Sequence, residues 1–113
     1  MRKSARTTVV NKRREDYDVY IGRGSRFGNP HQIGPDGDRD EVIRKFDYDF
    51  HTHLLKDPAF VQSLEALRGR RLGCFCKPAR CHGDVIAAYL NGEPRLVFAA
   101  AEEESKGSQL TLL

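Results

Sequence analysis

Residues 73–84 read Gly-Cys-Phe-Cys-Lys-Pro-Ala-Arg-Cys-His-Gly-Asp and join a predicted strand to a predicted helix. The strand spans residues 71–76, and alternation puts Leu72, Cys74 and Cys76 on one face and Gly73 and Phe75 on the other. A tight turn follows at residues 77–80. The helix begins near Asp84 and stops at Asn91-Gly92, and residues 96–98 are predicted as an additional edge strand.

The residues before this unit predict two more strands and two more helices. Residues 7–10 and 18–21 are rich in β-forming side chains. A long helix begins near Asp38, with a buried stripe at Val42, Ile43, Phe46, Phe50 and Leu54, and a second begins at Asp57-Pro58, with Val61, Leu64 and Leu67 inward and Gly69 as its stop. We therefore expect an α/β fold in which a small three- to four-stranded sheet packs with about three helices.

Composition limits the class of protein and its location. The chain has 113 residues, of which 39% are hydrophobic and 31% charged, so one globular domain is expected over residues 1–98. The basic start is followed only by Val9-Val10, too short an apolar run for a secretory signal or a membrane span. Three cysteines crowded between Cys74 and Cys81 fit reduced thiols better than disulfides. A cytoplasmic location is expected, with a basic amino-terminal arm that can contact phosphate backbones.

The cysteines and histidine of residues 74–82 are candidates for chemistry. Cys74, Cys76, Cys81 and His82 match a tetrahedral zinc set in type, although adjacent Cys-His ligands are unusual in spacing. A reactive thiol is the competing interpretation, with Cys76 or Cys81 as nucleophile and His82 as base, because nearby Lys77 and Arg80 favour a thiolate. Simple packing of small side chains is the third.

A second candidate site is the glycine-rich loop of residues 22–30. Its glycines can expose backbone N–H groups to an anion, and Arg23 and Arg26 supply forked donors for phosphate or carboxylate. The predicted ligand-binding residues are Arg23, Gly24, Ser25, Arg26 and Asn29. The spacing is that of neither a Walker A loop nor a dinucleotide fingerprint, and a structural turn with surface arginines is the alternative.

Several motifs together resemble a known family. They are residues 9–13 (VVNKR), 17–24 (YDVYIGRG), 27–30 (FGNP), 33–34 (IG), 36–39 (DGDR), 67–69 (LRG), 72–78 (LGCFCKP) and 81–84 (CHGD). The chain is similar here to short phage and bacterial proteins grouped as domain of unknown function DUF4326. The resemblance implies a small α/β fold and a phage or phage-like setting, and it carries over no functional residues.

The carboxyl-terminal residues indicate a partner. Residues 99–108 are small, acidic and polar and are expected to form a flexible linker. Gln109, Leu110, Leu112 and Leu113 match the peptide with which bacterial polymerases and repair proteins bind the DNA sliding clamp, its beta subunit. An apolar terminus or an edge strand is the alternative.

Three functions follow from these features. The leading hypothesis is a phage-encoded, non-enzymatic protein that binds the bacterial sliding clamp and so modulates or inhibits host DNA replication. The second is a nucleotide- or nucleic-acid-processing enzyme tethered to the clamp, with its site at the two loops. The third is a zinc-stabilised binding module.

Overall fold

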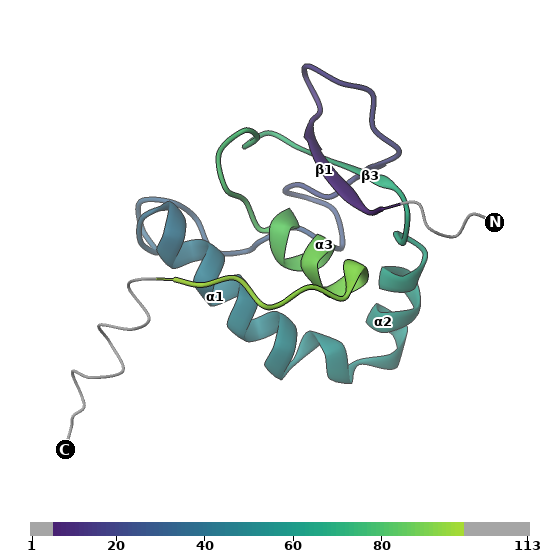
Figure 1. Cartoon of the computed structure of the whole chain (residues 1–113). Helices are drawn as coiled ribbons and strands as arrows, with labels where there is room; N and C mark the ends of the chain where they lie inside the picture. Colours follow the sequence, from purple (N-terminus) through teal and green to yellow (C-terminus); the bar gives the residue numbers. More distant parts are fainter. Residues whose placement is uncertain (1–5, 99–113) are drawn as a thin grey trace.

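The computed structural model describes residues 6–98, which form three strands and three α-helices with a short 3-10 turn (Figure 1). In chain order these are β1 (Thr8–Asn11), β2 (Val19–Tyr20), α1 (Arg39–Thr52), η1 (Leu54–Lys56), α2 (Pro58–Glu65), β3 (Arg71–Cys74) and α3 (Gly83–Asn91). The predicted α/β class, small sheet and helix number are confirmed.

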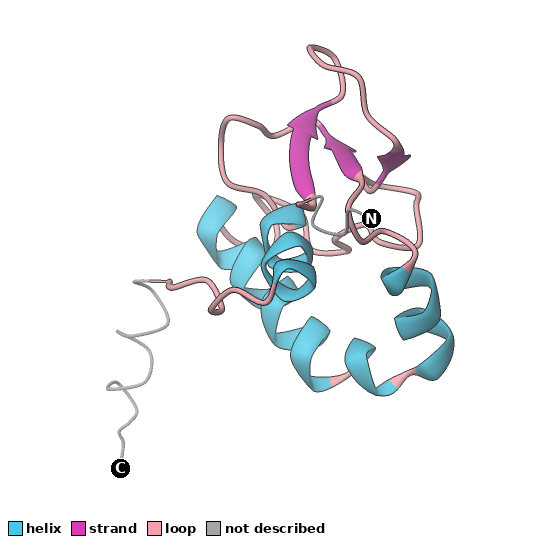
Figure 2. Ribbon diagram, turned by 45° about the vertical axis from the view of Figure 1, so that its right-hand side comes forward, coloured by secondary structure: helices cyan, strands magenta, loops and turns pink. Residues whose placement is uncertain are grey.

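The sheet is parallel throughout, with strand order β1-β3-β2. Leu72 in the central strand is in register with Val9 on one side and Val19 on the other. Figure 2 shows the three strands on one side of the molecule and the helices on the other. Because all three strands run the same way, their carboxyl ends meet at one edge, where ligands of open α/β sheets commonly bind.

The long helix α1 begins at a capping box. Asp38 Oδ1 accepts from the Glu41 amide at 2.9 Å, and the Asp38 amide donates to Glu41 Oε1 at 2.8 Å. These bonds satisfy two amides that the helix geometry leaves without intrahelical partners. They also fix where α1 starts, and therefore where its first residue, Arg39, is held.

Buried aromatic and aliphatic side chains from all layers form one core. The largest fully buried ones are Phe46 and Phe50 of α1, Leu64 of α2, Leu72 of β3, Ile86 of α3 and Ile21 after β2. The α3 helix packs against β1 and α1 and ends at Gly92, whose φ of 71° is a left-handed conformation that favours glycine. No helix within residues 6–98 has the length and apolar character to cross a membrane.

Three local expectations are wrong. Residues 96–98 form no strand: Val97 accepts a hydrogen bond from Arg80, and the buried Phe98 ring lies under the Arg80 guanidinium. The central strand ends at Cys74, and Cys76 already lies in the following turn, where its carbonyl accepts from the Ala79 amide. In α2 the inward side chain is Phe60, which is 6% exposed, and Val61 is only half-buried.

Prediction for the α1 cap: Asp38→Ala should lower the free energy of unfolding by about 1 kcal/mol, because it removes the carboxylate that accepts from the Glu41 amide. Urea denaturation measures this. Asp16→Ala is the matched control, since Asp16 is exposed and lies outside any helix. Equal stability of the two variants would contradict the role assigned to the cap.

Candidate functional site

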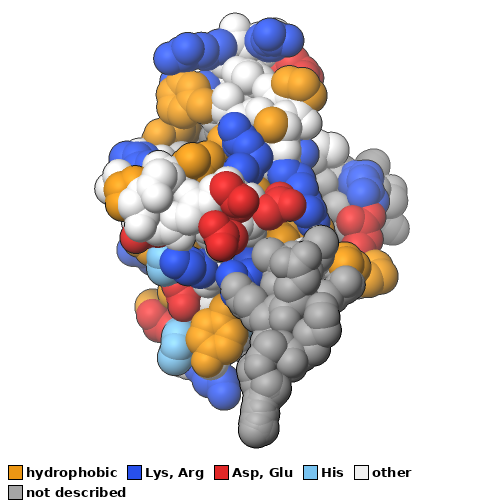
Figure 3. All heavy atoms as spheres, turned by 90° about the vertical axis from the view of Figure 1, so that its left-hand side faces the viewer, with side chains coloured by type: hydrophobic (Ala, Val, Ile, Leu, Met, Phe, Trp, Pro, Cys, Tyr) orange, Lys and Arg blue, Asp and Glu red, His pale blue; other side chains and the backbone are white. Residues whose placement is uncertain are grey.

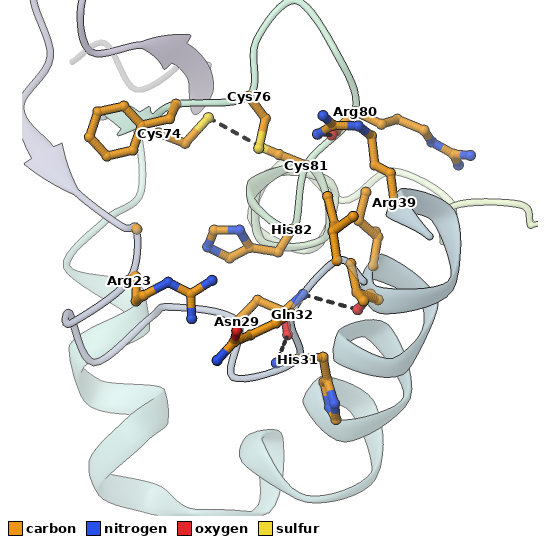
Figure 4. Close-up of a pocket in the computed structure, with 15 residues that line it drawn as sticks. Arg23, Asn29, His31, Gln32, Arg39, Cys74, Cys76, Arg80, Cys81 and His82 are labelled. Atoms are coloured by element: carbon orange, nitrogen blue, oxygen red, sulfur yellow. Dashed lines mark hydrogen bonds between the residues drawn. The ribbon is translucent and has the colours of Figure 1, made fainter. Parts of the chain in front are cut away.

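The two predicted loops line a single cavity of about 320 Å³ at the carboxyl edge of the sheet. The loop after β2 contributes Gly22, Arg23 and Asn29, and the turn between β3 and α3 contributes Cys74, Cys76, Cys81 and His82. The start of α1 closes the remaining side through Arg39, Val42 and Ile43. Figure 4 shows these groups converging from the three segments, with the Arg23 side chain extending toward His82.

A buried hydrogen bond joins the two loops. His82 Nε2 donates to the Ile21 carbonyl at 2.7 Å, and the imidazole ring packs edge-on against Phe46. His82 is 8% exposed, and burial lowers the pKa of its imidazole, so the ring is neutral near pH 7. A side chain at Gly83 would place its Cβ 2.7 Å from Ile21 Cδ1, so a larger residue here would require the buried Ile21 side chain to shift.

Two asparagines hold the loop backbones. Asn11, at the end of β1, donates from Nδ2 to the Lys77 carbonyl at 2.7 Å and so fixes the Cys/His turn. Asn29 donates from Nδ2 to the Val42 carbonyl at 2.9 Å and accepts from the His31 amide at 3.0 Å. Asn29, predicted as a ligand-binding residue, lines the cavity, and one bond at each end of its amide holds the loop in place.

The three cysteines lie together but differ in exposure. Cys74 and Cys81 are each 1% exposed, and their sulfur atoms are 3.3 Å apart. Cys76 is only partly buried and lines the cavity. All three are free thiols, as the sequence predicts for a reduced site.

The electrostatics of the cluster favour a thiolate at Cys76. The Cys81 thiol donates to its sulfur and Arg39 adds a hydrogen bond and positive charge, which together lower the pKa of Cys76 to about 5. Cys81 is the donor, so the pKa of Cys81 is raised. Cys74 also accepts from Cys81, and its pKa is lowered to about 6 although a charge on Cys76 opposes its ionisation. Both sulfurs therefore favour the thiolate, and Cys76 is the more exposed of the two.

The prediction that Cys74, Cys76, Cys81 and His82 bind zinc gains no support from their arrangement. Within residues 6–98, no group of three or more histidine, cysteine, aspartate and glutamate side chains is placed to hold a metal ion. His82 Nε2 donates to the Ile21 carbonyl, which fixes the orientation of the ring and leaves Nδ1 as its acceptor nitrogen.

The predicted anion loop divides into two parts. Arg23 lines the cavity, and its guanidinium makes no hydrogen bond or ion pair with any residue between 6 and 98. Arg26 points elsewhere and donates to Ser63 Oγ at 2.6 Å. Ser25 Oγ donates to the Gly22 carbonyl at 2.7 Å, and Gly24 lies outside the cavity, so both belong to the structural turn.

Sequence reasoning missed Arg39, which sits at the first position of α1 and donates to both Cys76 and the Arg80 carbonyl. A signal was present, because a helix amino terminus ordinarily favours acidic residues. The predicted clamp peptide, residues 109–113, and the linker, residues 99–108, lie outside the described residues.

Comparisons with known proteins identify the family. Residues 5–92 match the family model "Domain of unknown function (DUF4326)", and the chain belongs to that family. A relative from Enterobacteria phage T4, an "uncharacterized 12.4 kDa protein in nrdA-td intergenic region", is 46% identical over 84 residues, which cover 74% of this chain and 76% of the relative. No solved structure gives a significant match.

Prediction for the thiolate: iodoacetamide should label one cysteine, Cys76, with a rate that rises through a midpoint near pH 5. An ordinary thiol titrates near about 8.5. Intact-mass spectrometry across a pH series measures the rate. Cys76→Ser should abolish the fast label, and Arg39→Gln should move the midpoint upward because it removes a positive charge. A wild-type midpoint above pH 8 would exclude a stabilised thiolate.

Proposed function

We propose that the folded domain is a nucleotide- or nucleic-acid-processing enzyme whose site is the cavity between the loop after β2 and the Cys/His turn. The observation that carries this proposal is the combination, in one cavity, of the Cys76 thiolate and an Arg23 guanidinium that has no partner within residues 6–98. A nucleophile and an anion-binding group that face the same space are the two parts such a site requires.

The lining of the cavity suits an anionic ligand with a flat apolar portion. Besides the Cys76 thiolate, the charged groups among the described lining residues are three arginines: Arg23, Arg39 and Arg80. Apolar contact is available from Phe75, Ile33 and Ile43. The volume falls within the range of small-molecule sites, about 300–1,000 Å³. A phosphate group and a base supply these two kinds of surface in one molecule.

The thiolate supports an enzymatic role without a separate base. Cys76 is held deprotonated by the Cys81 thiol and by Arg39, so no group has to remove its proton during the reaction. Cys81 holds its own proton beside the nucleophile. We therefore assign Cys76 as the candidate nucleophile, Arg39 as its positioning partner and Arg23 as the anion ligand.

Prediction for ligand binding: Arg23→Ala should weaken binding of a nucleoside phosphate by about 1.5–3 kcal/mol, the range for hydrogen bonds to charged groups. Arg26→Ala is the matched control, because it removes the same charge from the same loop but outside the cavity. Thermal-shift screening of nucleoside mono-, di- and triphosphates, followed by calorimetry, gives the comparison. Equal losses in both variants would count against the cavity, and no binding by wild type would end the proposal.

The sequence of residues 109–113, Gln-Leu-Thr-Leu-Leu, favours a second function, binding to the bacterial sliding clamp. An extended peptide of this kind places leucines in a preformed apolar groove while the glutamine amide binds at its rim. The two functions are compatible, since the clamp would tether the domain at replicating DNA. If the cavity binds nothing, occupation of the groove alone would modulate or inhibit host replication.

Prediction for the tail: the protein should bind a bacterial sliding clamp with roughly micromolar affinity, and deletion of residues 109–113 should abolish binding. Each leucine can gain about 1.5–3 kcal/mol on burial, but ordering the peptide removes much of that gain. Leu112→Ala or Leu113→Ala should weaken binding more than the control Thr111→Ala, measured by calorimetry. Unchanged affinity after the deletion would refute the assignment.

A further inference from the structure

A cluster of cations and aromatic rings lies beside the cavity at the carboxyl edge of the sheet. We call it the aromatic–cation platform, and it consists of Lys12, Arg13, Tyr17, Tyr20 and Phe75. In Figure 1 the loop after β1 forms the upper end of the molecule, and Figure 3 shows basic and hydrophobic side chains interspersed at that end. The sequence places Phe75 far from the other four members, so only the fold brings them together.

The platform is built around the ring of Phe75. Lys12 Nζ lies 5.0 Å from the Phe75 centroid, and 5.5 and 5.7 Å from the centroids of Tyr20 and Tyr17. The Arg13 guanidinium carbon lies 4.9 Å from the Phe75 centroid, and Tyr20 packs edge-on against the same ring. These distances are within the range of cation–π attraction. The cations are therefore held at the aromatic surface.

The rings remain open to solvent. Phe75 is 47% exposed and Tyr17 is 38% exposed, which is unusual for large aromatic side chains at the end of a buried strand. The loop of residues 12–18 also carries Arg14, and its acids are Glu15, Asp16 and Asp18. Asp18 is already paired with Arg71 at 3.1 Å. Counting Arg23 at the adjoining cavity, cations outnumber the remaining acids around the platform.

We propose that the aromatic–cation platform binds single-stranded nucleic acid and guides the strand to the cavity. A base stacks on the exposed Phe75 ring while Lys12 and Arg13 contact the flanking phosphates, the combination by which proteins hold unpaired strands. Paired bases are already stacked within a duplex and cannot use such a ring. Phe75 also lines the cavity, so a strand on the platform reaches Cys76 without a gap. This second step rests on the proposed function, whereas strand binding does not.

The test uses the full chain and a fluorescent thymidine oligonucleotide of about 12 nucleotides, a typical length for such sites. Anisotropy titrations at several salt concentrations give the affinity and the salt slope. The double variant Lys12→Ala/Arg13→Ala should weaken binding and reduce the slope by about 0.7 for each phosphate that the protein no longer neutralises. The matched control is Lys56→Ala/Arg70→Ala, which removes the same charge from exposed positions in η1 and before β3.

The ring is tested separately. Phe75→Leu keeps apolar bulk but removes the stacking face, and it should weaken oligonucleotide binding roughly 5- to 150-fold, the affinity equivalent of losing one stacked base. Phe75→Tyr should bind like wild type. Circular dichroism melts identify any variant that is unfolded, and if the leucine variant does not fold, the comparison of Lys12→Ala/Arg13→Ala with its control double variant decides the matter.

The outcomes separate this inference from the proposed function. No oligonucleotide binding, equal binding of a duplex, or equal loss in the control double variant would overturn the platform. If a mononucleotide still binds in an Arg23-dependent way in those cases, the cavity assignment survives alone. Oligonucleotide binding without any mononucleotide binding would support strand binding by the platform and contradict the proposal that the cavity binds a nucleotide. Absence of both would end both proposals.

Discussion

The hydrogen bond from His82 to the Ile21 carbonyl is the constraint on which the site depends. It joins the residue before α3 to the residue after β2, which are 61 positions apart, inside a region that excludes water. Loss of either partner would leave a buried polar group unsatisfied, at a cost of about 1–3 kcal/mol. Because burial keeps the imidazole neutral, the bond persists as a neutral donor–acceptor pair near pH 7. The two walls of the cavity are therefore fixed by the core itself.

The parallel sheet determines which residues lie near the hydrogen bond between His82 and Ile21. Three strands that end at one edge deliver Asn11, Ile21 and Cys74 to the same level, and the residues that follow each strand become neighbours. The capping box fixes the start of α1, and Arg39 at that start reaches the Arg80 carbonyl in the Cys/His turn. A thiol that would be inert in an apolar core thus acquires a hydrogen-bond donor and a cation, and becomes a thiolate. The reactivity of Cys76 therefore depends on Cys81 and Arg39, which the fold brings close, more than on its neighbours in the sequence.

Periodicity was sufficient to predict the strands and the helices, and residue type predicted the Asp57 cap, because these depend on neighbours a few residues away. It failed at residues 96–98, where Phe98 is buried under Arg80 instead of entering the sheet. Both loops of the site were predicted from residue type, and the enzyme hypothesis placed one site at the two of them. The different directions of Arg23 and Arg26 could not be predicted, because a distant serine in α2, Ser63, determines one of them. Arg39 was missed for the same reason, since its partners lie in the Cys/His turn.

Charge bears on the three interpretations of the cysteines, which are a zinc site, a reactive thiol and simple packing. The Cys81 proton stabilises negative charge on the neighbouring sulfurs, which favours thiolate character at Cys76. A cation in the cavity would face Arg23, Arg39 and Arg80, and like charges at short range repel where water is partly excluded. The same three arginines attract an anion. Arg39, which favours the Cys76 thiolate, is also one of the three arginines that an anion in the cavity would meet.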